Sequence, residues 1–143
     1  MDKVYIVFWT QTGNTEAMAS AIRDGVKETG KDAVLLSPTE ASIADLKEVT
    51  AFALGCPAMG AEVLEEDEME PFVTEVEKMA AGKQIALFGS YGWGDGQWMR
   101  DWADRMAAAG ATVVGGEGVI AQEAPGAEEL EACKNLGKTL AEI

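Results

Sequence analysis

The sequence predicts an α/β fold of the doubly wound class, in which helices cover both faces of a five-stranded parallel sheet. Short apolar runs recur along the chain and leave room for a helix between successive runs. The intervals contain apolar residues at helical spacing, so strands and helices alternate. The chain has 143 residues, of which 48% are hydrophobic, and one domain spanning residues 1–143 can therefore bury its own core.

Four apolar runs have the length and composition of buried parallel strands. They are Val4–Trp9, Ala33–Leu36, Ala51–Cys56 and Ile85–Gly89. A fifth and weaker strand combines residues 112–114 with residues 119–121, with glycines between the two parts.

Amphipathic patterns between these runs predict helices, several of which end at a glycine. Their apolar positions are Met18, Ile22 and Val26; Phe72, Val73, Val76, Met79 and Ala80; Trp98, Trp102 and Met106; and Leu130, Cys133, Leu136 or Gly137, and Leu140. A weaker pattern lies at Ser42–Leu46. In such folds ligands bind beyond the carboxyl ends of the strands, where the strand order reverses. We therefore expect a site in the loops after the first, third and fourth strands.

Composition narrows the range of functions. Asp and Glu number 25 against 11 Lys and Arg, for a formal net charge of -14, which disfavours nucleic acid and anionic membranes and favours basic faces of partner proteins. The chain has no histidine, the commonest general base and metal ligand, so we expect neither a catalytic site nor a metal site. Cys56 and Cys133 are expected to be small core residues. No stretch has the pattern of a signal peptide or a membrane span, and we expect a cytoplasmic monomer.

The first of the three loops, Thr10–Thr15, carries three threonines, an asparagine and a glycine. Hydroxyls and backbone N–H groups at a strand-to-helix turn form a ready site for an anion. Thr12, Asn14 and Thr15 are also good helix caps, so the sequence leaves both interpretations open. The loop has no cation and lacks the Gly-Lys-Ser/Thr ending of a nucleotide-hydrolysing loop, which favours a phosphate that is held and not cleaved.

The second loop runs from Cys56 to Glu62. Gly60 can adopt a positive φ at little cost, so the turn has more than one accessible conformation. Met59 beside it can lie flat on an aromatic ligand. A plain turn without a ligand is the alternative interpretation.

The third loop, Gly89–Gly96, places Tyr91 and Trp93 among glycines. A large ring with bare backbone on both sides suits stacking on a planar ligand, although Trp93 folded back over the core is the alternative. Gln97 stands where a Gly-x-Gly-x-x-Gly dinucleotide pattern needs its third glycine. Together the three loops suit a phosphorylated planar heterocycle.

Three motifs resemble those of the flavodoxins, specifically the short-chain clostridial type. They are Thr-x-Thr-Gly-Asn-Thr at Thr10–Thr15, Gly-Cys-Pro-Ala-Met-Gly at Gly55–Gly60, and Leu-Phe-Gly-Ser-Tyr-Gly-Trp-Gly-Asp-Gly at Leu87–Gly96. The similarity runs in register over essentially the whole chain and implies the strand order 2-1-3-4-5. The chain departs from the family pattern at Gln11, where close relatives have glycine, at Ala61, and at Glu123, where an asparagine can occur.

The resemblance implies a low-potential one-electron carrier, not an enzyme, that holds FMN non-covalently and shuttles between semiquinone and hydroquinone. It also implies three groups of FMN contacts. The phosphate is held by Thr10, Gln11, Thr12, Gly13, Asn14 and Thr15. One side of the isoalloxazine ring is lined by Met59, Gly60, Ala61 and Glu62, with Ala58 before them. Trp93 stacks on the other side of the ring, and the residues near the ring edge and ribityl chain are Ser90, Tyr91, Gly92 and Gly94.

The resemblance further implies how the flavin is tuned. In the family, the carbonyl of the turn glycine, here Gly60, swings to accept a hydrogen bond from the flavin N5. Glycine followed by alanine favours a type II′ turn, which needs a positive φ at Gly60. The three loops contain no cation to neutralise the anionic reduced flavin, which makes the final reduction harder.

The run Glu62–Glu70 has six acids in nine positions. It is either a solvated helix start, where acids suit the helix dipole, or a negative rim that steers the basic faces of reductases and oxidoreductases toward the flavin.

Other functions are known for this kind of fold. An FMN-dependent quinone or NAD(P)H oxidoreductase would need a substrate pocket over the ring, which no insertion builds and which Trp93 would block. A response regulator is excluded, because Trp9 and Cys56 stand where it needs acids. A non-catalytic phosphate-binding module stays open and predicts a colourless protein.

Overall fold

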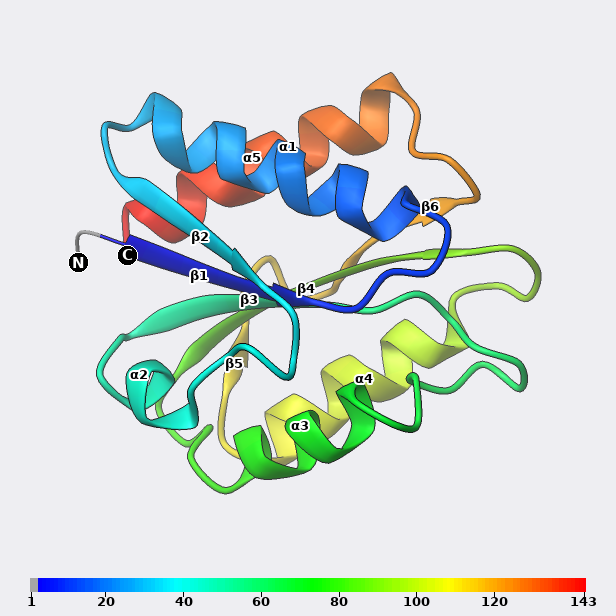
Figure 1. Ribbon diagram of the computed structural model, residues 1–143, viewed down its shortest axis with the longest axis horizontal. Coiled ribbons are helices and arrows are strands. Elements are labelled where there is room, and N and C mark those ends of the chain that lie inside the picture. The colour runs from blue at the N-terminus through cyan, green and yellow to red at the C-terminus, as the bar shows by residue number, and fades with distance from the viewer. Residues whose placement is uncertain (1–2) are drawn as a thin grey trace.

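A computed structural model describes residues 3–143. Strands and helices alternate from β1 to β5, and a short strand and a helix follow (Figure 1). The elements are β1 (Lys3–Phe8), α1 (Asn14–Glu28), β2 (Asp32–Leu36), α2 (Ile43–Lys47), β3 (Ala51–Gly55), α3 (Met69–Glu77), β4 (Gln84–Tyr91), α4 (Gln97–Ala108), β5 (Thr112–Val113), β6 (Val119–Gln122) and α5 (Ala127–Ala141).

The strands form one parallel sheet in the order β2-β1-β3-β4-β5, and β6 also pairs with β4. The predicted order is thus confirmed. The predicted fifth strand is two short strands, because Gly115 and Gly116 between them have φ values of +81° and +84° and leave the extended region. Since β6 pairs with residues 88–91, β4 continues to Tyr91, so Ser90 and Tyr91 belong to the strand and not to the loop predicted there.

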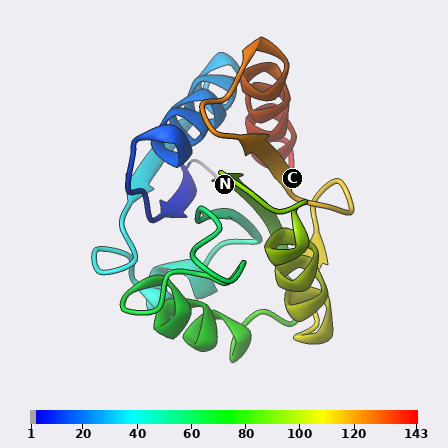
Figure 2. The same cartoon turned by 90° about the vertical axis from the view of Figure 1, so that its right-hand side faces the viewer.

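Helices cover both faces of the sheet, α1 and α5 on one side and α2, α3 and α4 on the other (Figures 1 and 2). Successive strand residues alternate between the two layers. In β3, for example, Ala53 packs in the α1–α5 layer and Leu54 in the α3–α4 layer, and both are fully buried. The burial of every residue of β3 shows that neither face of the sheet is exposed to solvent at its centre.

Glycine brings α1 and α5 into direct backbone contact. A Cβ at Gly137 would lie 2.0 Å from the carbonyl oxygen of Ile22, and one at Gly25 would lie 1.9 Å from that of Lys134. Since real Cβ atoms do not approach so closely, the two helices keep this spacing only with glycine at these positions.

The carboxyl ends of all the strands meet at one end of the sheet, which faces the viewer in Figure 2. The strand order reverses between β1 and β3, so the loops after β1, β3 and β4 converge there. Within residues 3–143, none of the helices combines the length and apolarity that a membrane crossing requires.

Candidate functional site

The loop after β1 leaves the start of α1 open. Gly13, at a φ of +94°, is the N-cap residue and no side chain caps the helix. The Thr10 hydroxyl instead accepts a hydrogen bond of 3.2 Å from the Gly13 N–H and shapes the loop. Of the two interpretations that the sequence left open, this geometry favours an anion site, because the hydroxyls of Thr12 and Thr15 are not used as caps.

Thr15 and Ser90 join the first loop to the end of β4. Their hydroxyl oxygens lie 3.0 Å apart, and the two residues are 1% and 5% exposed. The contact fixes the start of α1 against the central strand of the site. It therefore holds the first loop next to the strand from which the third loop begins.

A pocket of about 390 Å³ is lined by both of these residues. It brings together nine of the residues predicted from the sequence, from all three loops. They are Thr10, Gln11, Thr12, Asn14, Thr15, Ala58, Ser90, Tyr91 and Gly92. None of the residues lining this pocket, all of which lie in the described part of the chain, is basic.

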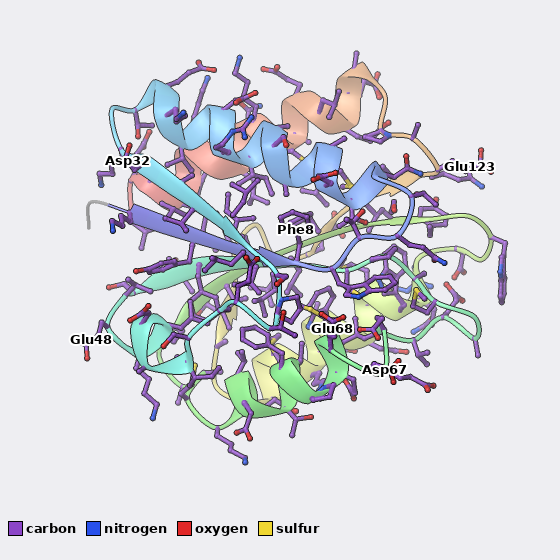
Figure 3. All side chains as sticks on the ribbon, viewed as in Figure 1. Phe8, Asp32, Glu48, Asp67, Glu68 and Glu123 are labelled. Atoms are coloured by element: carbon purple, nitrogen blue, oxygen red, sulfur yellow. The ribbon has the colours of Figure 1, made fainter. Side chains whose placement is uncertain are left out.

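Two further residues line the pocket that were not among the predicted contacts, Pro57 and Glu123. Glu123 follows β6 and has a φ of +57°, a left-handed conformation that is uncommon outside glycine and asparagine. Its N–H donates a hydrogen bond of 2.7 Å to the carbonyl oxygen of Tyr91, and Figure 3 places it beyond the end of the sheet. The glutamate at position 123, where an asparagine can occur in the family, was a signal for this contact that the sequence carried. The left-handed backbone conformation of Glu123 could not be read from the sequence.

The turn after β3 borders a second pocket, of about 460 Å³, which Met59, Gly60 and Ala61 share with Trp9. Gly60 has a positive φ of +26°, as predicted. The predicted type II′ turn, with Gly60 and Ala61 at its centre, would close between Met59 and Glu62, and this prediction is wrong. The N–H of Met59 donates to the carbonyl of Val63, and the N–H of Val63 donates back to Met59, so the turn closes one residue later. Glu62, with a φ of +56°, is the extra residue.

Trp93 lies on the loop between β4 and α4, and 65% of its surface is exposed. The interpretation in which Trp93 folds back over the core is therefore wrong. Trp98 occupies that core position instead. Its indole N–H donates a hydrogen bond of 3.2 Å to the carbonyl oxygen of Cys56, and the centroids of the Trp98 and Tyr91 rings lie 5.5 Å apart.

The acidic run after the turn is not uniformly solvated. Glu65 is only 6% exposed, and its carboxylate accepts hydrogen bonds from the N–H groups of Asp67, Glu68 and Met69 at 2.6–3.0 Å. Burial alone would raise the pKa of Glu65, but these three donors lower it below its ordinary value of 4.5. Glu65 is therefore the cap of α3, and only its exposed neighbours, such as Glu66 and Asp67, can form the predicted rim.

Both cysteines are buried free thiols, as predicted. Burial raises the pKa of each to about 12. The Cys56 sulfur accepts a hydrogen bond of 3.4 Å from the N–H of Glu65 and ties the far end of the loop to β3. Neither thiol is a nucleophile at neutral pH.

Comparison with known proteins identifies the family of this chain. The family model for flavodoxin matches residues 6–137. The chain belongs to the flavodoxin family. It is 46% identical to a flavodoxin from Clostridium beijerinckii over 96% of this chain and 99% of that protein. It is 44% identical to one from Megasphaera elsdenii over 96% and 98%.

A solved structure shows the same fold. The two-electron reduced Megasphaera elsdenii flavodoxin superposes with a TM-score of 0.86 at 41% identity, covering 98% of this chain and 99% of that one. Members of the flavodoxin family are electron-transfer flavoproteins that bind FMN, and they are carriers, not enzymes.

The residues of the site fit such a cofactor. The threonine loop offers hydroxyls and an open helix start but no cation, which suits a phosphate group. The exposed indole of Trp93 and the thioether of Met59 are the kinds of surface on which a flavin ring packs.

Proposed function

We propose that this protein is a low-potential one-electron carrier that uses FMN in the semiquinone–hydroquinone couple. The observation that carries the proposal is the pocket that joins the loops after β1, β3 and β4, because hydroxyl donors line it and no basic residue of the described chain does. A phosphate held by neutral donors leaves the negative charge of a reduced flavin uncompensated, and this charge opposes the last electron.

The assignment of contacts is supported by this pocket, by the second pocket beside the turn after β3 and by the exposed side chain of Trp93. We propose that residues 10–15 hold the phosphate, that residues 58–62 border the ring on one side, and that Trp93 closes over the other side with residues 90–92 and Gly94 near the ring edge. Ser90 and Tyr91 lie in β4, so they form a rigid border, whereas Trp93 lies on a loop. Bound FMN supplies the redox chemistry, and these residues bind and orient it.

The partners follow from the surface charge. We propose that the carrier acts as a cytoplasmic, single-domain monomer and meets basic faces of reductases and oxidoreductases. With a formal net charge of -14, attraction of a basic face at long range is favourable and is screened by salt.

The test is a measurement on the purified protein. We expect a yellow protein that releases one FMN on acid treatment, and a reductive titration in which a one-electron-reduced flavin accumulates before full reduction. A colourless protein that does not bind added FMN would contradict the proposal. Hydride transfer from NADPH with quinone turnover would instead identify the oxidoreductase of the same fold.

A further inference from the structure

A further pocket, of about 330 Å³, lies between α3 and α4, the two neighbouring helices on one face of the sheet (Figure 1). Its lining comes from both helices and from the segment that leads into α3. Leu64 and two tryptophans of α4, Trp98 and Trp102, are its large apolar residues that are buried. We call it the α3–α4 pocket. It shares no lining residue with the pocket that the threonine loop lines.

The two tryptophans differ in how their indole N–H groups are satisfied. Trp98 donates its N–H to the carbonyl oxygen of Cys56 at 3.2 Å. Trp102, one helical turn later and 1% exposed, finds no acceptor for its indole N–H among the described residues. A buried donor without an acceptor costs free energy, and native proteins rarely leave one unpaired. Since Trp102 lines the α3–α4 pocket, an occupant of the pocket can supply the missing acceptor.

The charge along the α3–α4 pocket is negative. Its lining residues, all in the described part of the chain, include four acids and one base, Arg105. The charge of Arg105 is already compensated, because its guanidinium pairs with Glu70 and with Glu77 of α3 at 2.7 Å each. Among the residues that the structure describes, neither of the exposed acids Glu66 and Asp101 has a basic partner. The pocket therefore favours an occupant with a positive charge.

These features together define the chemistry of the occupant. It needs a hydrogen-bond acceptor for the N–H of Trp102, an apolar part to lie against Leu64, and a cation to face the exposed acids. An arginine residue in an extended peptide segment has all three, since its backbone carbonyl accepts, its methylene groups are apolar and its end is charged. Its guanidinium also packs flat against indole rings and binds carboxylates through two parallel hydrogen bonds.

The α3–α4 pocket adjoins the proposed flavin site through one ring. Trp98 lines the α3–α4 pocket, and the centroid of its ring lies 5.5 Å from that of Tyr91. Tyr91 in turn lines the pocket that the threonine loop shares. A protein held between α3 and α4 would therefore lie beside the loops that we assign to FMN.

We propose that the α3–α4 pocket receives an arginine side chain of a partner protein, with the indole N–H of Trp102 bound to the peptide carbonyl of that arginine. The pocket then recognises one residue of the partner, whereas the exposed acidic rim attracts its whole basic face. The role of the partner in electron transfer rests on the proposed function. The binding of a basic peptide segment rests on the contacts of the pocket alone.

The binding is tested by NMR on the FMN-loaded, isotope-labelled protein, titrated with acetyl-Gly-Arg-Gly-amide. We expect the indole N–H resonance of Trp102 to move downfield, because this N–H gains an acceptor. The indole N–H of the exposed Trp93 is the internal control and should stay in place. The peptide acetyl-Gly-Gln-Gly-amide, which has the same backbone without the charge, should move neither resonance at the same concentration.

A matched pair of variants tests the contribution of charge. Asp101→Asn removes an acid that lines the α3–α4 pocket, whereas Asp104→Asn removes an exposed acid of the same helix that lies outside it. Both variants change the net charge equally. We expect Asp101→Asn to weaken the binding of the arginine peptide about threefold and Asp104→Asn to leave it unchanged.

Three results would overturn the proposal. The arginine peptide could fail to bind, or it could bind without moving the Trp102 resonance, which would place it elsewhere on the acidic surface. Equal weakening in the two variants would show attraction by net charge alone. If the wild-type chain binds no FMN, the proposed function fails, while the same titration of the flavin-free chain still decides whether the α3–α4 pocket binds the peptide.

Discussion

The hydroxyl groups of Thr15 and Ser90 lie 3.0 Å apart inside the protein, although 75 positions separate them in the chain. One stands at the start of α1 and the other near the end of β4. Both are almost fully buried, so neither hydroxyl can turn to bulk water. The contact fixes the first loop of the site to the strand beside it.

This contact predicts a coupling in stability. Thr15→Val keeps the shape of the side chain but leaves the Ser90 hydroxyl without its partner, and we expect a loss of about 1–3 kcal/mol in the free energy of unfolding. Ser90→Ala should cost less once Thr15 is already valine. Urea unfolding of the two single variants and the double variant gives the coupling energy. Strictly additive losses would show that the hydroxyls do not stabilise each other.

Glu65 predicts a dependence of stability on pH. Its pKa is lowered in the folded protein, so its contribution is fully present above the unfolded value near 4.5 and is lost as the pH falls through the folded value. Glu65→Gln should lower the free energy of unfolding at pH 7 by about 1–2 kcal/mol and flatten the acid limb of its pH profile. Glu66→Gln is the exposed control. Identical pH profiles for the two variants would contradict the capping role.

Gly60 predicts a change in redox behaviour through the backbone alone. A Cβ at this position would meet no atom within 4 Å, so a larger residue is not excluded by crowding. The positive φ nevertheless disfavours a β-branched side chain. In Gly60→Val we expect less one-electron-reduced flavin during reductive titration, severalfold in the equilibrium for about 1 kcal/mol. As much of this state as in the wild type would show that the conformation of Gly60 is not needed.

The exposed part of the acidic rim predicts a salt-dependent rate. Neutralising Glu66 and Asp67 together should slow association with a basic c-type cytochrome at low salt, and the difference should shrink as salt is added. The control removes the same charge from the opposite end of the sheet with Asp32→Asn and Glu48→Gln, which Figure 3 shows far from Asp67. Stopped-flow measurements decide between the two. Equal slowing in both would indicate net charge and not a local rim.

The architecture could be predicted because uniformly apolar runs and helical periodicity can be read directly from one sequence. The limits of β4 could not, because its last residues pair with β6, whose own pattern is broken by glycines. Local composition also singled out the loop after β1 and Trp93, although it left two interpretations open for each, and the uncapped start of α1 and the exposure of Trp93 came from the structure. The closure of the turn at Val63 was not, because it depends on the left-handed conformation of Glu62.

The acidic run shows why composition fails at the level of single residues. Six acids within residues 62–70 are equivalent in a sequence pattern. The fold divides them by direction: Glu62 caps α4, Glu65 caps α3, and Glu66 and Asp67 face the solvent. Only the three-dimensional path of the loop separates these roles. A charge-neutralising experiment that treats the run as one patch would therefore mix stability with association.

The burial of Cys56 and Cys133 gives the molecule a built-in reporter of its own opening. One thiol lies beneath the α3–α4 layer and the other in α5 against the opposite face. An alkylating reagent can reach either sulfur only when the layer above it lifts away. Pulse labelling followed by mass spectrometry would therefore time the breathing of the two halves separately, without an added probe.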